Sequence, residues 1–219
     1  AMKSLDPELA AIAAAMPADA PSLFELDPPV AREIFAGIAE QKPAANVKGV
    51  NIEDITLSEG PDTLGLRIYR PHNLNSDASI VFLHGGGYML GLTSLMDGEA
   101  LFIAEATGSV VVSVDYRLAP EHPLPAAHED ALAALDWVDR NVLSLGGNPD
   151  KVCIAGESAG ANLAASAMIA RRDQGKPLAA ALLVVPAPDL GAIARIADSD
   201  QTFPMLTPHD LRAITRICV

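Results

Sequence analysis

Short apolar segments alternate with longer helical ones from residue 79 onward, which leaves few possible architectures. Each apolar segment is bounded by Gly, Pro or charged residues, as buried strands are, and the segments cover 79–85, 109–116, 151–156 and 179–187. Helical patterns lie between them at 97–108, 131–146 and 159–172. This alternation predicts an α/β protein with a mostly parallel central sheet and helices on both faces.

The first 70 residues follow other patterns. Residues 5–41 carry two helical patterns and no strand pattern. The apolar positions of the second helix repeat at helical spacing and are Val30, Ile34, Phe35 and Ile38. Segments 50–57 and 64–71 instead alternate apolar and polar residues, so they predict an antiparallel hairpin.

Polar residues predict where two of the helices begin. Asp97 is expected to cap the helix over 97–108, because its carboxylate can accept from amides of the first turn. Thr207, Pro208 and Asp210 are an N-cap, a proline at the first helical position and an acid at the third. A helix is therefore predicted from 207 to 217.

The charge of the chain disfavours some partners. The 219 residues carry a formal net charge of −13, and Lys and Arg do not cluster. Phosphate groups would repel such a surface, so nucleic acid and anionic membranes are not expected as partners. No apolar run approaches a membrane span, and Asp6 and Glu8 beside the N-terminal Ala-rich stretch are wrong for a signal peptide. We expect a soluble cytoplasmic protein, with Cys153 in the core and not in a disulfide.

The segment Gly156-Glu157-Ser158-Ala159-Gly160 lies between a predicted buried strand and a predicted helix. A G-x-S-x-G pattern in this context is typical of a nucleophile elbow. The sharp turn exposes the serine hydroxyl, and side chains at the two flanking positions would clash, so both are glycine. The alternative is an ordinary glycine-rich turn in which Ser158 only caps the helix.

A second glycine-rich segment, His84-Gly85-Gly86-Gly87-Tyr88, directly follows the strand at 79–85. Three consecutive glycines leave backbone N–H groups uncovered, and beside an elbow such a loop supplies oxyanion-hole donors. The spacing fits no phosphate-binding loop. A flexible loop without function is the alternative. His84 is interpreted as a hydrogen-bonding organiser of the loop and not as a base.

Together with DYRLAPEHP at 115–123, these motifs resemble the bacterial hormone-sensitive-lipase family of α/β-hydrolase esterases. The resemblance covers essentially the whole chain and implies an α/β-hydrolase fold with an N-terminal helical cap. It implies Ser158 as nucleophile and the backbone N–H groups of Gly86, Gly87 and Ala159 as oxyanion donors. His84, Gly85 and Glu157 would support the loops. Segment 115–123 is expected to be structural, with Arg117 and Glu121 able to pair.

The resemblance also implies short-acyl, uncharged ester substrates and no cofactor. Tyr88, Phe24 and Phe35 are the residues expected to line the pocket. No metal is expected either, because the sequence has no H-E-x-x-H and no Cys–His cluster.

A serine nucleophile needs a base that is itself oriented by a carboxylate. In α/β-hydrolases these residues follow the serine, each after a later strand. Only one further strand, at 179–187, is predicted after Ser158. His209 and Asp189 are better explained by capping and turn roles. We therefore expect the acid, the base and the last strands of the sheet to be missing, and activity to be low.

The expected division of the chain is a cap segment at 1–45, the hydrolase core at 46–200 and the start of a second cap segment at 201–219. Strand 179–187 should then form an exposed apolar edge. A fragment of a longer protein explains such an edge, and so does a homodimer that pairs the edges of two copies. A rival function is a non-catalytic module that binds small molecules in the same capped pocket.

Overall fold

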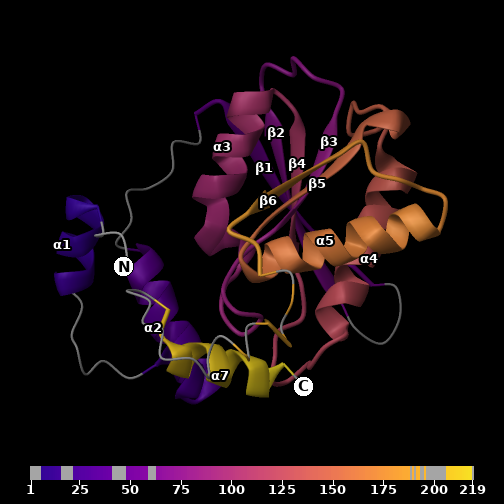
Figure 1. Cartoon of the computed structure of the whole chain (residues 1–219). Helices are drawn as coiled ribbons and strands as arrows, with labels where there is room; N and C mark the ends of the chain where they lie inside the picture. Colours follow the sequence, from indigo (N-terminus) through magenta and orange to yellow (C-terminus); the bar gives the residue numbers. More distant parts are fainter. Residues whose placement is uncertain are drawn as a thin grey trace.

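The structure is a computed structural model, and the described residues are 6–15, 22–40, 48–58, 63–187, 189, 191–192, 195 and 206–218. Within them a single mixed sheet forms the centre of the molecule (Figure 1). Its strands are β1 (Val50–Leu57), β2 (Leu64–Pro71), β3 (Ser79–Leu83), β4 (Val110–Asp115), β5 (Val152–Glu157) and β6 (Ala180–Val184).

The strand order is β1-β2-β4-β3-β5-β6. The β1–β2 and β2–β4 pairs are antiparallel, whereas the β4–β3, β3–β5 and β5–β6 pairs are parallel. Both the predicted hairpin and the predicted parallel sheet are therefore confirmed. Because β3 and β5 are adjacent and parallel, the loops that follow them lie together at the carboxyl ends of the strands.

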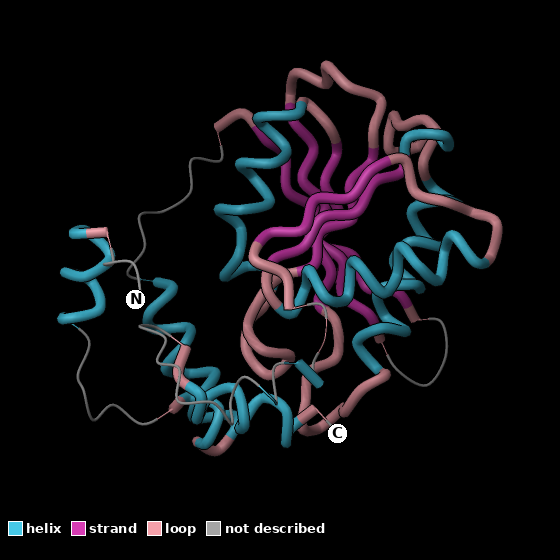
Figure 2. The backbone as a smooth tube through the Cα atoms, viewed as in Figure 1, coloured by secondary structure: helices cyan, strands magenta, loops and turns pink. Residues whose placement is uncertain are grey.

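Helices cover both faces of the sheet, as Figure 2 shows. Helix α3 (Asp97–Thr107) packs on one face through Ala100, Leu101 and Ala104. Helices α4 (Ala126–Asn141) and α5 (Ala159–Asp173) pack on the other, where the larger apolar core lies. Helix α4 begins five residues before the pattern predicted from residue 131, directly after Pro125. The short 3-10 helices are η1 (Leu23–Glu25), η2 (Thr93–Met96) and η3 (Pro149–Lys151).

The N-terminal helices are α1 (Pro7–Ala15) and α2 (Pro28–Glu40), and α7 (Pro208–Ile217) lies close to η1 (Figure 1). Thr207, Pro208 and Asp210 form the predicted capping box at the start of α7. Helices α2 and α7 both contact η1, and they lie together below the sheet in Figure 1. The expected boundaries at 45–46 and 200–201 lie outside the described residues.

The predicted role of Asp97 is wrong. Met96 occupies the N-cap position of α3, because η2 runs directly into the helix and leaves Asp97 already helical. The Asp97 carboxylate instead accepts from Tyr69 Oη over 2.6 Å and pairs with Arg67 Nε at 3.0 Å. It therefore joins α3 to β2 and does not cap its own helix.

The apolar face predicted for α2 is largely exposed in the described structure. Val30, Ile34 and Ile38 are 47%, 42% and 52% exposed. The helix packs instead through the fully buried Ala31 and the partly buried Phe35, which contact a cluster containing Met89 and Leu90. The small Ala31 side chain lets the α2 backbone approach this loop closely.

Strand β6 lies at one end of the strand order, and most of its residues are exposed, including Leu182 at 52% and Val184 at 43%. The predicted apolar edge is thus present among the described residues. No helix in the part of the chain that the structure describes is long and apolar enough to cross a membrane. Cys153 is partly buried and Cys218 is buried, and both are free thiols.

Candidate active site

Ser158 lies at a sharp turn between β5, which ends at Glu157, and α5, which begins at Ala159. Its backbone angles are φ 53° and ψ −114°, a combination that residues with a side chain rarely adopt. The Ser158 amide donates to Val184 O over 2.9 Å, which ties the turn to the neighbouring strand β6. The local backbone has the strained geometry expected of an elbow, and Ser158 is only partly buried.

The glycines on either side of Ser158 are required by close backbone contacts. A Cβ atom on Gly156 would lie 2.3 Å from Gly160 O. A Cβ atom on Gly160 would lie 2.0 Å from Leu83 O and 2.4 Å from His84 O. All three distances are far below van der Waals contact, so any side chain would force the two turns apart. This agrees with the steric reason inferred from the sequence.

The glycine loop after β3 has an unusual backbone as well. Gly86, Gly87 and Tyr88 have φ angles of 116°, 60° and 63°, and Leu90 N donates to Gly86 O over 2.9 Å to close the turn. Only glycine adopts such angles without strain, so Tyr88 is held there by its surroundings. Tyr88 is 2% exposed and belongs to the main core cluster.

His84 is buried beneath this loop. Its ring stacks on Tyr116 with the ring centroids 4.2 Å apart, and Tyr116 Oη donates to His84 O over 2.8 Å. His84 Nδ1 lies 2.7 Å from Gly85 O, and because a carbonyl oxygen only accepts, Nδ1 carries the proton. Burial lowers the pKa of His84, so the ring is neutral at pH 7. This arrangement suits the loop-organising role predicted for His84.

The elbow and the glycine loop are in contact. Leu83 at the end of β3 pairs with Gly156 at the end of β5. The first turn of α5 abuts the carbonyls of Leu83 and His84 through Gly160, and a Cβ atom on Gly85 would lie 2.7 Å from Glu157 Oε2. The backbone N–H groups at the start of α5 lack partners within their own helix, and its dipole is positive at this end. Ser158 therefore lies where uncovered N–H groups from two loops can converge.

Apolar side chains from the N-terminal segment and from α7 cover the loop. A Cβ atom on Gly87 would lie 2.5 Å from Phe24 Cε1 and 3.2 Å from Ile214 Cδ1, so both side chains occupy the space beside this glycine. Phe24 was expected near the site, but Ile214 was not. The three-residue spacing of Leu211, Ile214 and Ile217 in the predicted helix was the signal that could have identified it. Phe35 packs farther along the loop, near Met89.

The predicted Arg117–Glu121 pair is not formed. Arg117 instead binds Asp130 of α4, with its amide at 2.7 Å from Asp130 Oδ2 and its Nη2 at 2.9 Å from Asp130 Oδ1. Glu121 pairs with Arg32 of α2 at 2.7 Å. The turn through Pro120 and Pro123 points the two side chains toward different helices, which local spacing alone does not reveal.

The other histidines make contacts of their own. His72 Nε2 is 3.0 Å from Asn51 Oδ1, and His128 contacts the side chain of Asn162. His209 pairs with Glu25, on the exposed side of α7. Asp189 Oδ1 accepts from Ala192 N over 2.9 Å, as a turn residue does. Among the described residues none of these groups hydrogen-bonds to Ser158.

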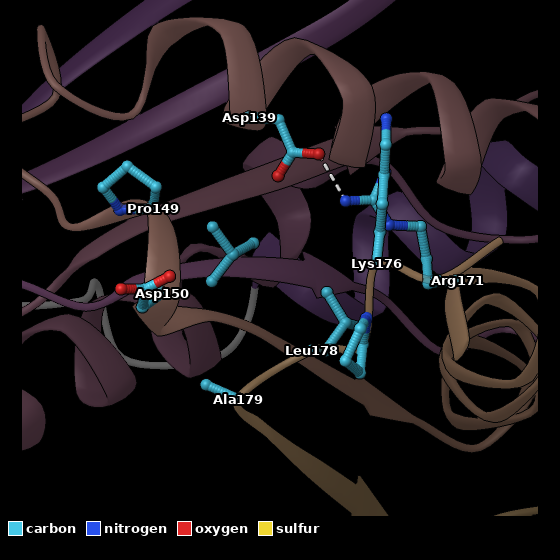
Figure 3. A pocket seen from close by; sticks show the side chains of 10 residues that line it. Asp139, Pro149, Asp150, Arg171, Lys176, Leu178 and Ala179 are labelled. Atoms are coloured by element: carbon cyan, nitrogen blue, oxygen red, sulfur yellow. Dashed lines mark hydrogen bonds and ion pairs between the residues drawn. The ribbon is translucent and has the colours of Figure 1, made fainter.

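The structure has a separate pocket of about 570 Å³, shown in Figure 3. It lies near the starts of β5 and β6, whereas Ser158 follows the end of β5, so it is at the opposite end of the sheet. Arg171 in its wall pairs with Asp136 at 2.7 Å and also with Asp139, which balance its charge. Within the described ranges no three His, Cys, Asp or Glu side chains are grouped to hold a metal ion.

Comparisons with known proteins agree with this geometry. A sequence model of the alpha/beta hydrolase fold family matches residues 80–219. Carboxylesterase NlhH of Mycobacterium tuberculosis is 42% identical over 140 residues, which are 63% of this chain and 44% of that protein. The arylesterase of Saccharolobus solfataricus is 37% identical over 156 residues, or 70% of this chain and 49% of the relative.

Among solved structures, a hyperthermophilic esterase from the archaeon Pyrobaculum calidifontis superposes with a TM-score of 0.85 at 33% identity. The match covers 98% of this chain and 70% of that one. The chain thus spans less than half the length of the curated relatives given above.

Proposed function

Because this chain belongs to the alpha/beta hydrolase fold family and carries the motifs of its hormone-sensitive-lipase branch, we propose that the protein hydrolyses carboxylic esters through an acyl-enzyme on Ser158. The observation that carries the proposal is the strained backbone of Ser158 beside the glycine loop. A serine that only caps a helix needs no positive φ, whereas Ser158 has φ 53° and is followed and preceded at two residues by glycines that admit no side chain.

In the proposed reaction Ser158 Oγ attacks the ester carbonyl carbon, and the carbonyl oxygen becomes an oxyanion. The backbone N–H groups of Gly86, Gly87 and Ala159 donate to it, and the dipole of α5 favours its negative charge. The tetrahedral intermediate collapses, and the alcohol leaves with the proton that the Ser158 hydroxyl gave up. Water then adds to the acyl-enzyme, which releases the carboxylic acid and restores the Ser158 hydroxyl. His84, Gly85 and Glu157 support the two loops that carry the donors.

The proposal assigns neither the acid nor the base of a triad to the described residues. His84 is neutral and buried, and its Nδ1 proton is used on Gly85 O. His209 is engaged with Glu25 on the surface. Without an assisting base, the 219-residue chain is expected to hydrolyse esters several orders of magnitude more slowly than an esterase with a complete triad. The oxyanion hole should still leave some residual rate.

The proposed substrates are short-acyl, uncharged esters. Phe24 and Ile214 fill the space beside Gly87, and Tyr88 and Phe35 pack near the same loop, so the side chains around the loop are apolar, which supports uncharged substrates. In this proposal segments 1–45 and 201–219 act as a cap over a core formed by 46–200. Solubility and a cytoplasmic location remain predictions.

Labelling with a fluorophosphonate, combined with hydrolysis of a short-acyl nitrophenyl ester, tests the proposal. The expected result is slow turnover and labelling at Ser158, both abolished in Ser158→Ala. Turnover that survives in Ser158→Ala would refute it. The rival, a non-catalytic binding module, predicts saturable binding of a carboxylate or ester without any labelling.

The predicted homodimer would use the exposed edge of β6, where Leu182 and Val184 face solvent. Light scattering over a range of concentrations tests it. A mass that stays at that of one chain would exclude pairing through this edge.

A further inference from the structure

Arg32 of α2 reaches out of its helix to three acceptors on other segments. Its Nε donates to Met89 O over 2.9 Å, and its Nη2 donates to Ala119 O over 3.1 Å. Nη1 and Nη2 also bind the two oxygens of Glu121 at 2.7 Å each. The planar guanidinium is thus used for a bidentate carboxylate contact and two backbone carbonyls at once.

Both carbonyls belong to the backbone that shapes the glycine loop. Met89 lies in the turn that the hydrogen bond from Leu90 N to Gly86 O closes. Ala119 N donates to Tyr88 O over 2.9 Å, so the Ala119 segment holds the loop from outside. Arg32 therefore bonds to the loop and to the segment that braces it.

The loop needs such bracing, because its conformation is unfavourable in isolation. Gly86, Gly87 and Tyr88 are three consecutive residues with positive φ. Tyr88 has a side chain and is disfavoured there, so only surrounding contacts keep it in place. Bonds to Tyr88 O and Met89 O hold the backbone that follows these residues, and the bond from Leu90 N to Gly86 O ties this backbone to the peptide plane that carries the Gly87 N–H.

We propose that Arg32 is a positioning residue that holds the glycine loop in the conformation that exposes its N–H groups, through Met89 O and Ala119 O. The proposal rests on the proposed esterase function for its catalytic consequence, but its structural claim concerns the loop alone. Glu121 orients the guanidinium, and the Arg32 charge in turn lowers the pKa of the Glu121 carboxyl. Arg32 thus links helix α2 to the glycine loop by hydrogen bonds, beside the packing of Ala31 and Phe35 on Met89 and Leu90.

A merely structural surface ion pair would behave differently. It would change the unfolding midpoint and leave the loop as it is. Arg70 offers a matched control, since its Nη1 donates to Leu145 O over 2.6 Å at the opposite end of the sheet. Arg70→Ala removes an arginine–carbonyl bond of the same kind without touching the loop.

The test compares the parent with Arg32→Ala, Arg32→Lys and Arg70→Ala by hydrogen exchange and ester hydrolysis. In Arg32→Ala the Leu90 and Ala119 amides should exchange at least tenfold faster, and kcat should fall on the order of tenfold to a hundredfold with KM nearly unchanged. The exchange rates and kcat of Arg32→Lys should lie between those of the parent and Arg32→Ala, because an ammonium group cannot bind all three acceptors. Arg32→Lys also serves if Arg32→Ala folds poorly.

Parent-like exchange of the Leu90 and Ala119 amides in both Arg32 variants would overturn the proposal. The proposal would also be overturned if the Leu90 and Ala119 amides exchanged as fast in Arg70→Ala as in Arg32→Ala. Hydrolysis that persists in Ser158→Ala would refute the esterase function while the exchange result still decides the role of Arg32. Parent-like kcat in Arg32→Ala, with Ser158→Ala inactive, would overturn the role of Arg32 alone.

Discussion

Replacing Gly160 by alanine sets two effects of opposite sign against each other. Alanine favours a helix over glycine by about 1 kcal/mol, so propensity alone predicts a more stable protein. The new Cβ atom, however, would lie 2.0 Å from Leu83 O and 2.4 Å from His84 O. Both are backbone atoms at the end of β3, so neither can rotate away.

The steric effect should win. Forcing a methyl group into a packed site costs about 1–3 kcal/mol, and a contact this short belongs at the upper end or beyond. After subtraction of the helix gain, Gly160→Ala is expected to destabilise the fold by about 2 kcal/mol or more. For a chain of this size, that lowers the melting temperature by roughly 4–8 °C.

Gly98→Ala is the matched control for the denaturant or thermal unfolding assay. Gly98 is the second residue of α3, as Gly160 is of α5, and a Cβ atom built on it meets nothing within 4 Å. It should raise stability by up to about 1 kcal/mol. If Gly160→Ala proved as stable as the parent, the claim that the elbow and the glycine loop are in rigid contact would be refuted.

Three further predictions concern groups around the same loop. Tyr88→Phe should leave the unfolding midpoint unchanged or raise it slightly, because the buried Tyr88 hydroxyl has no hydrogen-bond partner among the described residues; a clear loss of stability would show that it has one. Asp130→Ala should cost about 3 kcal/mol in denaturant unfolding, since it removes the 7%-exposed carboxylate that binds Arg117; a loss below about 1 kcal/mol would contradict this. Arg32 lowers the pKa of Glu121 below its ordinary value of 4.5, so below this pH the unfolded chain binds more protons and the stability that the pair contributes is lost. The free energies of unfolding of the parent and of Glu121→Gln should therefore converge at low pH. A difference that stays constant with pH would argue against the pairing.

The parts of the site that depend on local sequence were predictable. The elbow and the glycine loop each combine a buried strand with glycines at fixed positions, and sterics demand those glycines whatever the rest of the chain does. The capping box at Thr207 was predictable for the same reason, since its donors and acceptors lie within four residues.

The contacts that join distant segments were not predictable from one sequence. Arg32 and Met89 are 57 positions apart, and nothing near Arg32 marks it as a partner of a loop carbonyl. Arg117 lies closer in sequence to Glu121, yet it binds Asp130, because the direction of the proline-rich turn decides which helix it meets. The prediction of the buried face of α2 was wrong for a similar reason, because periodicity identifies an apolar stripe but not the surface that the helix packs against.

The pairing of β3 with β5 has a consequence for how the protein is made. Ser79 pairs with Val152, while the neighbour on the other side of β3, beginning at Val110, is much closer along the chain. During synthesis at roughly 5–20 residues per second, one side of the buried strand β3 stays without its partner for several seconds before β5 emerges. Such non-local parallel pairing folds slowly. Expression yield should therefore respond to temperature and chaperone supply more than the stability of the finished fold would suggest.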